Sequence, residues 1–525
     1  MKKIVYLLVY MIIPVSFFTS CKETKEHAAP IKDQTKITSV EIQKDEDFRP
    51  NFHFTPQNNW MNDPNGMFYF NGYFHLFFQY YPDDNVWGPM HWGHAISSDM
   101  ISWKEQPIAI YPDEKGYIFS GSAVVDKNNT SGFGKDGKTP IVAMFTYHDP
   151  KGEEKGAIDY QSQAIAYSLD EGQTWTKYEA NPVIENPGIK DFRDPKVIWD
   201  GIHQQWIMVL AAHDKTLFYA SKDLKNWTRQ SEFGEGIGAH GGVWECPDFF
   251  PMYVEGTDEV KWVLIQSLNP GGYNGGSGTQ YFIGDFDGKQ FTTTQTDEKW
   301  IDLGRDNYAG ITYNNLPDEE RTFIAWMSNW EYGQETPTEK WRSAMTLPQK
   351  VSLHKNKEYF LANTPVASII EGLSDVPIDI SREQNTSLFS HKNLNQAVVS
   401  FKLPKPLKDF KINVGNADGE ELTISFDAQA AKYSLDRSKS GLTDFSDKFA
   451  LPIMEAPADF IDSDSAEFQI FLDASSIEFF ADSGANAITA QFFPEKPYTQ
   501  FSITTEDEVK NLKITPIPSI WKDNN

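Results

Sequence analysis

An irregular internal repeat in the first two-thirds of the chain is the feature that most restricts its fold. Each repeat has a strand-like run, a turn that contains an aspartate, and an aromatic residue shortly afterwards. Four segments follow this pattern: HAISSDMISW (94–103), IAYSLDEGQTW (165–175), YASKDLKNW (219–227) and IGDFDGKQF (283–291). Their spacing of roughly 50–70 residues is the length of a four-stranded propeller blade with its loops. A fifth, less regular unit fits between residues 307 and 353, so the repeat predicts a five-bladed β-propeller over residues 49–355.

The rest of the chain also has the pattern of an all-β protein. Short runs of β-branched and aromatic residues alternate with Gly, Asn, Asp and Pro turns, and no long stretch keeps a helical period. After a linker at 356–374, residues 375–525 contain period-2 strands such as EELTISFD and NAITAQFFP, which are typical of a β-sandwich. We therefore predict a propeller followed by a C-terminal β-sandwich. The alternative is that the repeats themselves form a pair of sandwiches with coincidental turns.

The first 21 residues have the form of a bacterial lipoprotein signal. Lys2 and Lys3 precede an apolar stretch from 4 to 18, which Pro14 interrupts, and Cys21 stands at its end. The stretch is too short for a comfortable membrane span. We predict that Cys21 becomes the lipidated first residue of an exported protein, anchored at an outer membrane, a cell surface or a periplasmic face. An ordinary cleaved signal peptide is the alternative.

Composition limits the partners of the chain. Residues 22–48 are polar and rich in Lys and Glu, and we expect them to form a flexible tether. The chain has 47 basic and 74 acidic residues, and a net charge of −27 makes binding to nucleic acid or to an anionic membrane surface unfavourable. Apart from Cys21, Cys246 is the only cysteine, which excludes a disulfide framework. We expect a monomer without a cofactor, which meets the membrane only through its lipid.

Each predicted blade has an unusual early segment. The segments are MNDPNG at Asp63, FSGSAVVD at Ser120, FRDPKVIWD at Asp194, WECPDFF at Glu245 and RDNYAGITY at Asp306. Because the innermost strands of a propeller surround its axis, residues at their starts converge at one end of the central channel. Three carboxylates in a pocket walled by Trp and Phe suit glycoside hydrolysis: one attacks the anomeric carbon, one protonates the leaving oxygen, and one holds sugar hydroxyls. The alternative is that the aspartates only shape turns and the glutamate is a solvated charge.

Four ordered motifs, WMNDPNG, FSGS, FRDP and WECPD, resemble those of glycoside hydrolase family 32, the β-fructosidases. The resemblance runs from about residue 49 to the C-terminus, and WGPMHWGHAIS and GGVWECPDFF look especially like bacterial levanases. It implies a five-bladed propeller followed by a β-sandwich, which agrees with the repeat. It also implies Asp63 as the nucleophile, Glu245 as the general acid/base and Asp194 as the stabiliser of the transition state.

The resemblance further implies a set of residues that line a fructose pocket: Asn62, Gln79, Trp87, Phe119, Ser120, Arg193 and Trp330. Arg193 should hold a neighbouring carboxyl in its ionised form, because an adjacent cation favours the charged state. Asp248 shares a motif with Glu245, but a period of two places it off the Glu245 face. We expect Asp248 to be structural.

Two further groups of residues have competing interpretations. Trp87 and Trp330 are expected to stack on sugar, and the alternative is a place in the core alone. His91 and His94 suggest zinc, but two histidines three positions apart on a strand-like segment, with no other ligands nearby, do not make a zinc site. We therefore expect no metal.

The resemblance implies a retaining β-fructosidase that releases fructose from the non-reducing ends of levan or inulin, with sucrose as a further candidate substrate. Three alternatives stay open: an endo-levanase with the same catalytic residues, a fructosyl transferase, and a non-catalytic surface glycan-binding lipoprotein. A pocket that surrounds one terminal fructose favours exo-cleavage. The loops around 81–87 and 330–341 would close or open that pocket, and their positions are not evident from the sequence.

Overall fold

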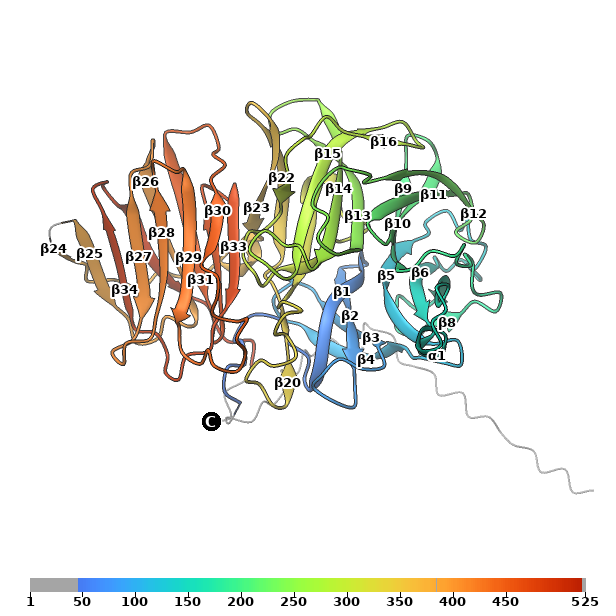
Figure 1. Cartoon of the computed structure of the whole chain (residues 1–525), viewed down its shortest axis with the longest axis horizontal. Coiled ribbons are helices and arrows are strands. Elements are labelled where there is room, and N and C mark those ends of the chain that lie inside the picture. The colour runs from blue at the N-terminus through green and yellow to red at the C-terminus, as the bar shows by residue number, and fades with distance from the viewer. Residues whose placement is uncertain (1–45, 384, 522–525) are drawn as a thin grey trace, which may run out of the picture. The chain divides into compact units, whose positions relative to one another are not determined.

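The computed structural model describes residues 46–383 and 385–521, and this part of the chain is almost entirely β-structure (Figure 1). Its helices are short: α1 (Pro150–Glu154), η2 (Asp318–Glu320) and η3 (Ala367–Ile369). No helix of the described part is long and apolar enough to cross a membrane. The expected signal at 1–21, with Cys21, and most of the expected tether at 22–48 lie outside the described residues.

Five sheets in succession confirm the predicted propeller. The first contains β1 (Asn59–Phe70), β2 (Tyr73–Tyr81), β3 (His91–Ser97) and β4 (Lys104–Ile110). The second contains β5 (Tyr117–Val125), β6 (Ile141–His148), β7 (Gln161–Ser168) and β8 (Thr176–Lys177). The third contains β9 (Phe192–Asp200), β10 (Gln205–Ala212), β11 (Lys215–Ser221) and β12 (Trp227–Phe233). All three sheets pair consecutive strands in antiparallel fashion.

The last two blades close the ring. The fourth contains β13 (Val243–Tyr253), β14 (Val260–Asn269), β15 (Gly278–Phe286), β16 (Phe291–Thr292) and β17 (Lys299–Trp300). The fifth contains β18 (Tyr308–Thr312), β19 (Thr322–Met327), β21 (Ala344–Met345), β22 (Gln349–Lys355) and β23 (Tyr359–Pro365). The short β20 (Trp341–Arg342) leaves this blade and pairs in parallel with β1. The innermost strands β1, β5, β9, β13 and β18 contact one another in order, and β18 contacts β1.

The repeat itself is a turn between the third and fourth strands of a blade. In the first blade, Asp99 accepts hydrogen bonds from the backbone N–H groups of Ile101 and Ser102, and the Trp103 ring N–H donates back to the Met100 carbonyl. The turns at Asp170 and Asp223 repeat this arrangement with their own tryptophans. The aspartate accepts hydrogen bonds from N–H groups of the turn, and the tryptophan ring N–H donates to a carbonyl of the same turn, which explains why the two residues lie four or five positions apart.

Two further sheets form the β-sandwich. One has seven strands: β24 (Ser381–Glu383), β25 (Thr386–Ser390), β34 (Gln500–Thr505), β27 (Phe410–Gly415), β28 (Glu421–Asp427), β29 (Lys432–Lys439) and β30 (Met454–Pro457). The other has five: β33 (Asn486–Gln491), β32 (Ser476–Ala481), β31 (Ser465–Leu472), β26 (Ala397–Pro404) and β35 (Lys510–Pro516). Alternate residues of β28, Leu422, Ile424 and Phe426, point into the shared core, as the period-2 pattern predicts.

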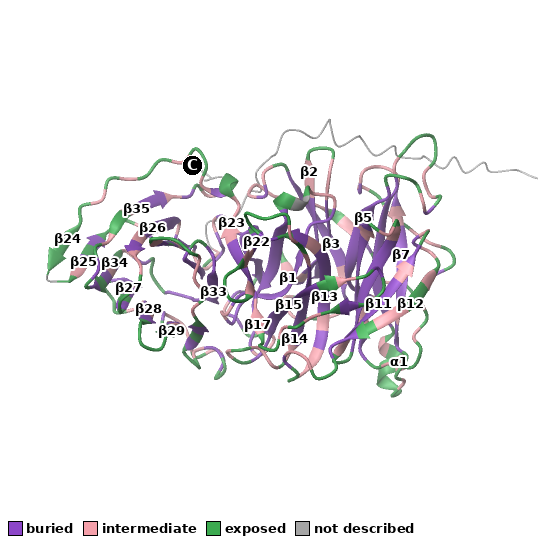
Figure 2. Ribbon diagram, turned by 90° about the horizontal axis from the view of Figure 1, so that it is seen from above, coloured by how far each residue is buried: buried purple, intermediate pink, exposed green. Residues whose placement is uncertain are grey.

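Burial differs between the two parts (Figure 2). Every residue of β6 is buried, because a blade packs against a neighbour on each face, whereas β28 buries alternate residues.

β23, at Tyr359–Pro365, pairs with β22 along its whole length. The fifth sheet therefore extends into the segment 356–374 that the sequence pattern treated as a linker, because backbone pairing with β22 continues past the short turn at 356–358.

Candidate active site

All the residues predicted to form the site line one cavity of about 280 Å³ at the end of the channel where the innermost strands begin. The predicted members are Asn62, Asp63, Gln79, Trp87, Phe119, Ser120, Arg193, Asp194, Glu245 and Trp330. The cavity is also lined by residues that the sequence did not single out: His148, Glu153, Tyr160, Gln161, Asp191 and Asn269. Radial packing of the blades thus collects side chains from distant parts of the chain.

Asp63 is held in the cavity by donors on both of its carboxylate oxygens. Asn62 Nδ2 donates to Oδ1 at 2.9 Å, and Ser120 Oγ donates to Oδ2 at 2.8 Å. A register shift between β1 and β2 at Met61–Pro64 turns this segment out of regular strand geometry. Burial raises the pKa of Asp63, the charge of Glu245 raises it further, and the two hydrogen bonds oppose the shift. Asp63 therefore does more than shape a turn, because its carboxylate is aimed into the cavity.

Asp194 lies deeper, on a strained piece of backbone. Its φ of 63° is in the left-handed region, which aspartate tolerates better than most residues. The backbone N–H of Asp194 donates to Thr146 Oγ1 at 3.0 Å, and its Oδ2 accepts the backbone N–H of Cys246 at 3.0 Å. Burial raises the pKa of Asp194 to about 7, although nearby Arg193 acts in the opposite direction. The strain is retained because it points the carboxylate at the cavity.

Glu245 is oriented by an arginine and a tyrosine. Arg193 donates to Glu245 Oε1 from Nη2 at 3.0 Å and from Nε at 3.3 Å, while the Tyr308 hydroxyl donates to Oε2. Arg193 Nη1 also donates to Asp191 Oδ1 at 2.8 Å. Burial alone would lower the pKa of Arg193, but the surrounding carboxylates raise it well above its usual value. The guanidinium is thus a permanent cation that positions Glu245 at the cavity wall.

Cys246 lies beneath the carboxylates and does not face the cavity opening. Its φ of 46° coincides with a register shift in β13, so the residue sits at a distortion of the strand. Sγ lies 3.5 Å from Asp63 Oδ2 and 3.6 Å from Asp194 Oδ2. Burial and the three nearby carboxylates raise the pKa of the thiol well above its usual value. Cys246 is therefore a neutral S–H donor between two acids, with no disulfide partner in the described residues.

Asp248 points away from this cavity, into a buried pair. Its Oδ2 lies 3.1 Å from Lys196 Nζ and accepts both the backbone N–H and the hydroxyl of Thr312. These contacts tie β9, β13 and β18 together. Asp248 therefore holds the innermost strands to one another, in agreement with the structural part expected for it.

Aromatic side chains form the walls of the cavity. Trp330 packs against Trp60 and Trp326, with ring centroids 5.9 and 4.9 Å away. Phe119 stacks on His148 at 4.3 Å, and Trp87 meets Phe119 edge-on at 6.2 Å. Gln79 is buried, and its Nε2 has no hydrogen-bond partner within the described residues. The cavity thus combines flat apolar surfaces with a polar donor that the protein leaves unpaired.

Tyr308 and Asp191 are the most important site residues that the sequence motifs did not identify. Tyr308 belongs to RDNYAG, in which the predicted residue is Asp306, and Asp306 is buried outside the cavity. Asp191 stands only three positions before Asp194 in DFRD, and that proximity was the available signal.

Within the described residues, no group of three or more His, Cys, Asp or Glu side chains is arranged to hold a metal ion.

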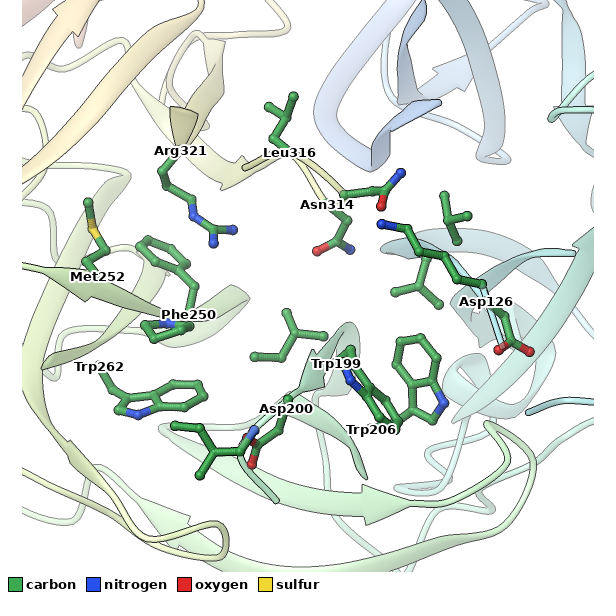
Figure 3. A pocket seen from close by; sticks show the side chains of 18 of the residues that line it. Asp126, Trp199, Asp200, Trp206, Phe250, Met252, Trp262, Asn314, Leu316 and Arg321 are labelled. Atoms are coloured by element: carbon green, nitrogen blue, oxygen red, sulfur yellow. The ribbon is translucent and has the colours of Figure 1, made fainter. Parts of the chain in front are cut away.

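A larger cavity, of about 590 Å³, lies at the opposite ends of the innermost strands (Figure 3). Asp126 and Asp200 are its acidic residues, and both are engaged by turns. Asp126 accepts hydrogen bonds from the backbone of Thr130 and Ser131. Asp200 accepts from the backbone of His203 and pairs with its ring. Despite its size, this cavity does not bring three carboxylates together, so the smaller one is the candidate active site.

Fold and cavity together define a glycoside hydrolase built on a five-bladed propeller with a C-terminal sandwich. The match is specific: the model of the N-terminal domain of glycosyl hydrolases family 32 covers residues 53–365, and that of the C-terminal domain covers 370–516. The chain belongs to glycosyl hydrolases family 32.

Similar proteins agree with this assignment. The chain is 44% identical to a levanase of Bacillus subtilis, over 91% of this chain and 71% of the relative. It is 42% identical to an extracellular exo-inulinase of Aspergillus niger, over 86% of this chain and 90% of the relative. The crystal structure of an exo-inulinase from Aspergillus awamori matches with a TM-score of 0.83 and 37% identity, over 91% of this chain and all of the other.

Proposed function

We propose that the protein is a retaining β-fructosidase that releases fructose from the non-reducing ends of fructans, levan or inulin, with sucrose as a further candidate. The observation that carries the proposal is the cavity in which Asp63, Asp194 and Glu245 converge beside Arg193. The similarity to levanase and exo-inulinases supports fructan as the substrate class.

In the proposed mechanism, a carboxylate oxygen of Asp63 attacks the anomeric carbon of the terminal fructose as its bond to the next sugar breaks. Glu245 gives its proton to the departing oxygen and then takes a proton from the water that hydrolyses the fructosyl–Asp63 ester. Two displacements at the same carbon retain its configuration. Tyr308 and Arg193 hold the Glu245 carboxyl in place for both proton transfers.

The crowding of acids in the cavity favours the transition state. Burial raises the pKa values of Asp63 and Asp194, since their ionised forms are poorly solvated there. Positive charge that develops on the fructosyl ring relieves this unfavourable crowding. The electric field of these acids is in place before the reaction begins. Such preorganisation is the main source of electrostatic stabilisation in enzymes.

Sugar binding is assigned to the cavity walls. The unpaired Gln79 Nε2 can donate to a sugar hydroxyl, and a buried donor without a partner is unfavourable by about 1–3 kcal/mol. Trp87, Phe119 and Trp330 offer flat faces to the ring. Asn62, which also accepts the Trp60 ring N–H at 2.8 Å, is held rigidly at the floor.

The loops around the cavity favour exo-cleavage. Trp87 donates its backbone N–H to Gln334 Oε1 at 3.2 Å, and Asn85 Nδ2 donates to the Glu339 carbonyl at 2.7 Å. The two loops that the sequence left unplaced therefore contact each other and join the Trp87 and Trp330 sides of the cavity. A joined rim suits a chain end better than the interior of a polymer.

Export and anchoring complete the proposal. The relatives named extracellular support export, and the Lys-Lys, apolar stretch and Cys21 of the N-terminus support a lipid anchor. Extraction of the protein from cells should then require detergent, and Cys21→Ala should release it in soluble form. Release of the unaltered protein without detergent would contradict the anchor and leave the catalytic proposal untouched.

The function is tested by the products formed early from levan, inulin and sucrose. We expect fructose as nearly the only product in the first few per cent of conversion, with Asp63→Asn as the inactive control. A ladder of oligosaccharides at that stage would support the endo-levanase alternative with the same catalytic residues. Binding of levan without any hydrolysis would support a glycan-binding lipoprotein.

A further inference from the structure

The β-sandwich reaches the propeller through a buried arginine. Arg437, on β29, places Nη1 2.6 Å from Asp306 Oδ2, and each side chain is at most 1% exposed. Arg437 Nη2 donates to the Tyr332 hydroxyl at 2.7 Å, and that hydroxyl donates to Asp306 Oδ1 at 2.7 Å. Three side chains thus close a ring of hydrogen bonds, with one member from the sandwich and two from the propeller.

The sandwich holds this guanidinium in a single orientation. Arg437 Nε donates to the Phe449 carbonyl at 3.0 Å, and Nη1 also donates to the Gln491 carbonyl at 3.0 Å. The centroid of the Phe449 ring lies 3.9 Å from Cζ of Arg437. Asp306 Oδ2 in turn accepts the backbone N–H of Gln491 at 2.9 Å. Sandwich groups therefore fix the guanidinium in the orientation in which it contacts its propeller partners.

Both propeller partners stand two residues away from a wall of the active site. Asp306 precedes Tyr308, whose hydroxyl donates to Glu245. Tyr332 follows Trp330, whose backbone N–H is bonded to Ser277 Oγ at 3.1 Å and whose ring lines the cavity. Displacement of either partner would carry with it a group that touches the acid/base or the sugar.

We propose that Arg437 is a positioning residue, through which the β-sandwich fixes Tyr308 against Glu245 and Trp330 against the substrate. The proposal rests on the fructan-hydrolysing pocket described above. It gives the sandwich a part in catalysis although none of its described residues lines the cavity.

Arg437 neutralises the buried charge of Asp306. If Arg437 is replaced by an uncharged side chain, Asp306 keeps a buried carboxylate without its cation, which is strongly unfavourable. Asp306 must then move, take up a proton or admit water, and each response shifts the segment that bears Tyr308. Small misplacements at a catalytic site reduce rates strongly, by up to about a hundredfold for 1 Å.

The test compares Arg437→Met with a matched sandwich variant, Lys405→Met. Lys405 pairs with the buried Asp482 at 2.7 Å inside the sandwich, so its removal also breaks a buried ion pair. Each variant is assayed well below its melting temperature with levan and inulin. For Arg437→Met we expect kcat to fall and KM to rise, with a loss of about tenfold or more in kcat/KM. Lys405→Met should lower the melting temperature and leave both constants near those of the unaltered protein.

A second variant keeps the proposal testable if Arg437→Met does not fold. Tyr332→Phe removes only the hydroxyl that links Arg437 to Asp306, and we expect weaker fructose binding in a titration followed by tryptophan fluorescence. This measurement needs no turnover, so it also separates failure of the proposal from failure of the proposed function. Unchanged kcat and KM in a folded Arg437→Met, or unchanged fructose affinity in Tyr332→Phe, would show that the contact serves stability alone.

Discussion

The two ends of the propeller channel are built from the same strands and differ in what their carboxylates do. Asp194 lies near the start of β9 and Asp200 at its end. Asp194 shares its surroundings with two other acids, and burial raises its pKa to about 7. Asp200 instead accepts hydrogen bonds from the turn that follows it and pairs with the His203 ring at 2.6 Å.

This difference shows that cavity size does not identify the site. The larger cavity, at the Asp200 end, has its acids satisfied by local turns. The smaller cavity keeps three carboxylates close together and one amide donor unpaired. Acids that share a poorly solvated cavity and have shifted pKa values indicate a functional site better than cavity size does.

Asp63→Asn should have the largest effect. The amide cannot form the covalent intermediate, so turnover of levan should fall at least about a thousandfold while the protein folds normally. The measurement is fructose release per folded molecule, with circular dichroism as the check on folding. Activity close to that of the unaltered protein would end the proposed mechanism.

Glu245→Gln should follow, with a loss of at least about a hundredfold, because proton transfer to the leaving oxygen is removed. The measurement is fructose release from levan per folded molecule. Tyr253→Phe, at the other end of the same strand, is the control and should leave the rate unchanged. Activity of a folded Glu245→Gln close to that of the unaltered protein would exclude Glu245 as the acid.

Asp194→Asn should separate activity from stability. We expect a loss of tens of fold to about a hundredfold in kcat, because one electrostatic contact in the transition state disappears. The unfolded chain releases the Asp194 proton near its ordinary pKa, and the folded protein holds it until about pH 7. Folding therefore becomes less favourable as pH rises through that window, and the neutral amide avoids this penalty.

The melting temperature of Asp194→Asn should accordingly exceed that of the unaltered protein above pH 7, and the difference should shrink toward pH 4. Asp200→Asn should behave in the opposite way, with a lower melting temperature and unchanged activity, since it loses hydrogen bonds that stabilise a turn. If Asp194→Asn melts below the unaltered protein at every pH, the Asp194 carboxylate does not destabilise the fold.

Cys246→Ser should have the smallest effect on activity. Serine retains a donor beside Asp63 and Asp194, although its shorter bond changes both distances. We expect activity within about tenfold of the unaltered protein, in keeping with modest values for single neutral hydrogen bonds. Complete inactivation of a correctly folded variant would mean that the thiol itself takes part in the reaction.

Sequence patterns were sufficient for the architecture, and the family resemblance supplied the prediction of the three acids. The spaced aspartate turns define the blades because each satisfies its own turn locally, as at Asp99 and Asp223. Period-2 alternation identified the sandwich because its two sheets bury one face each. Asp63, Asp194 and Glu245 were predicted because their motifs resemble those of glycoside hydrolase family 32, and the innermost strands bring the three side chains to one cavity.

Only the tertiary structure determines which side chains bind and orient those acids. The Tyr308 hydroxyl and Glu245 are 63 residues apart, and Arg437 and Asp306 are 131 apart, so no local pattern couples them. The contact of the 81–87 loop with the 330–341 loop has the same origin, since it depends on how the first and fifth blades meet. Local hydrogen bonding and side-chain periodicity depend on residues that are neighbours in the sequence. The partners of a catalytic group depend on the packing of whole blades.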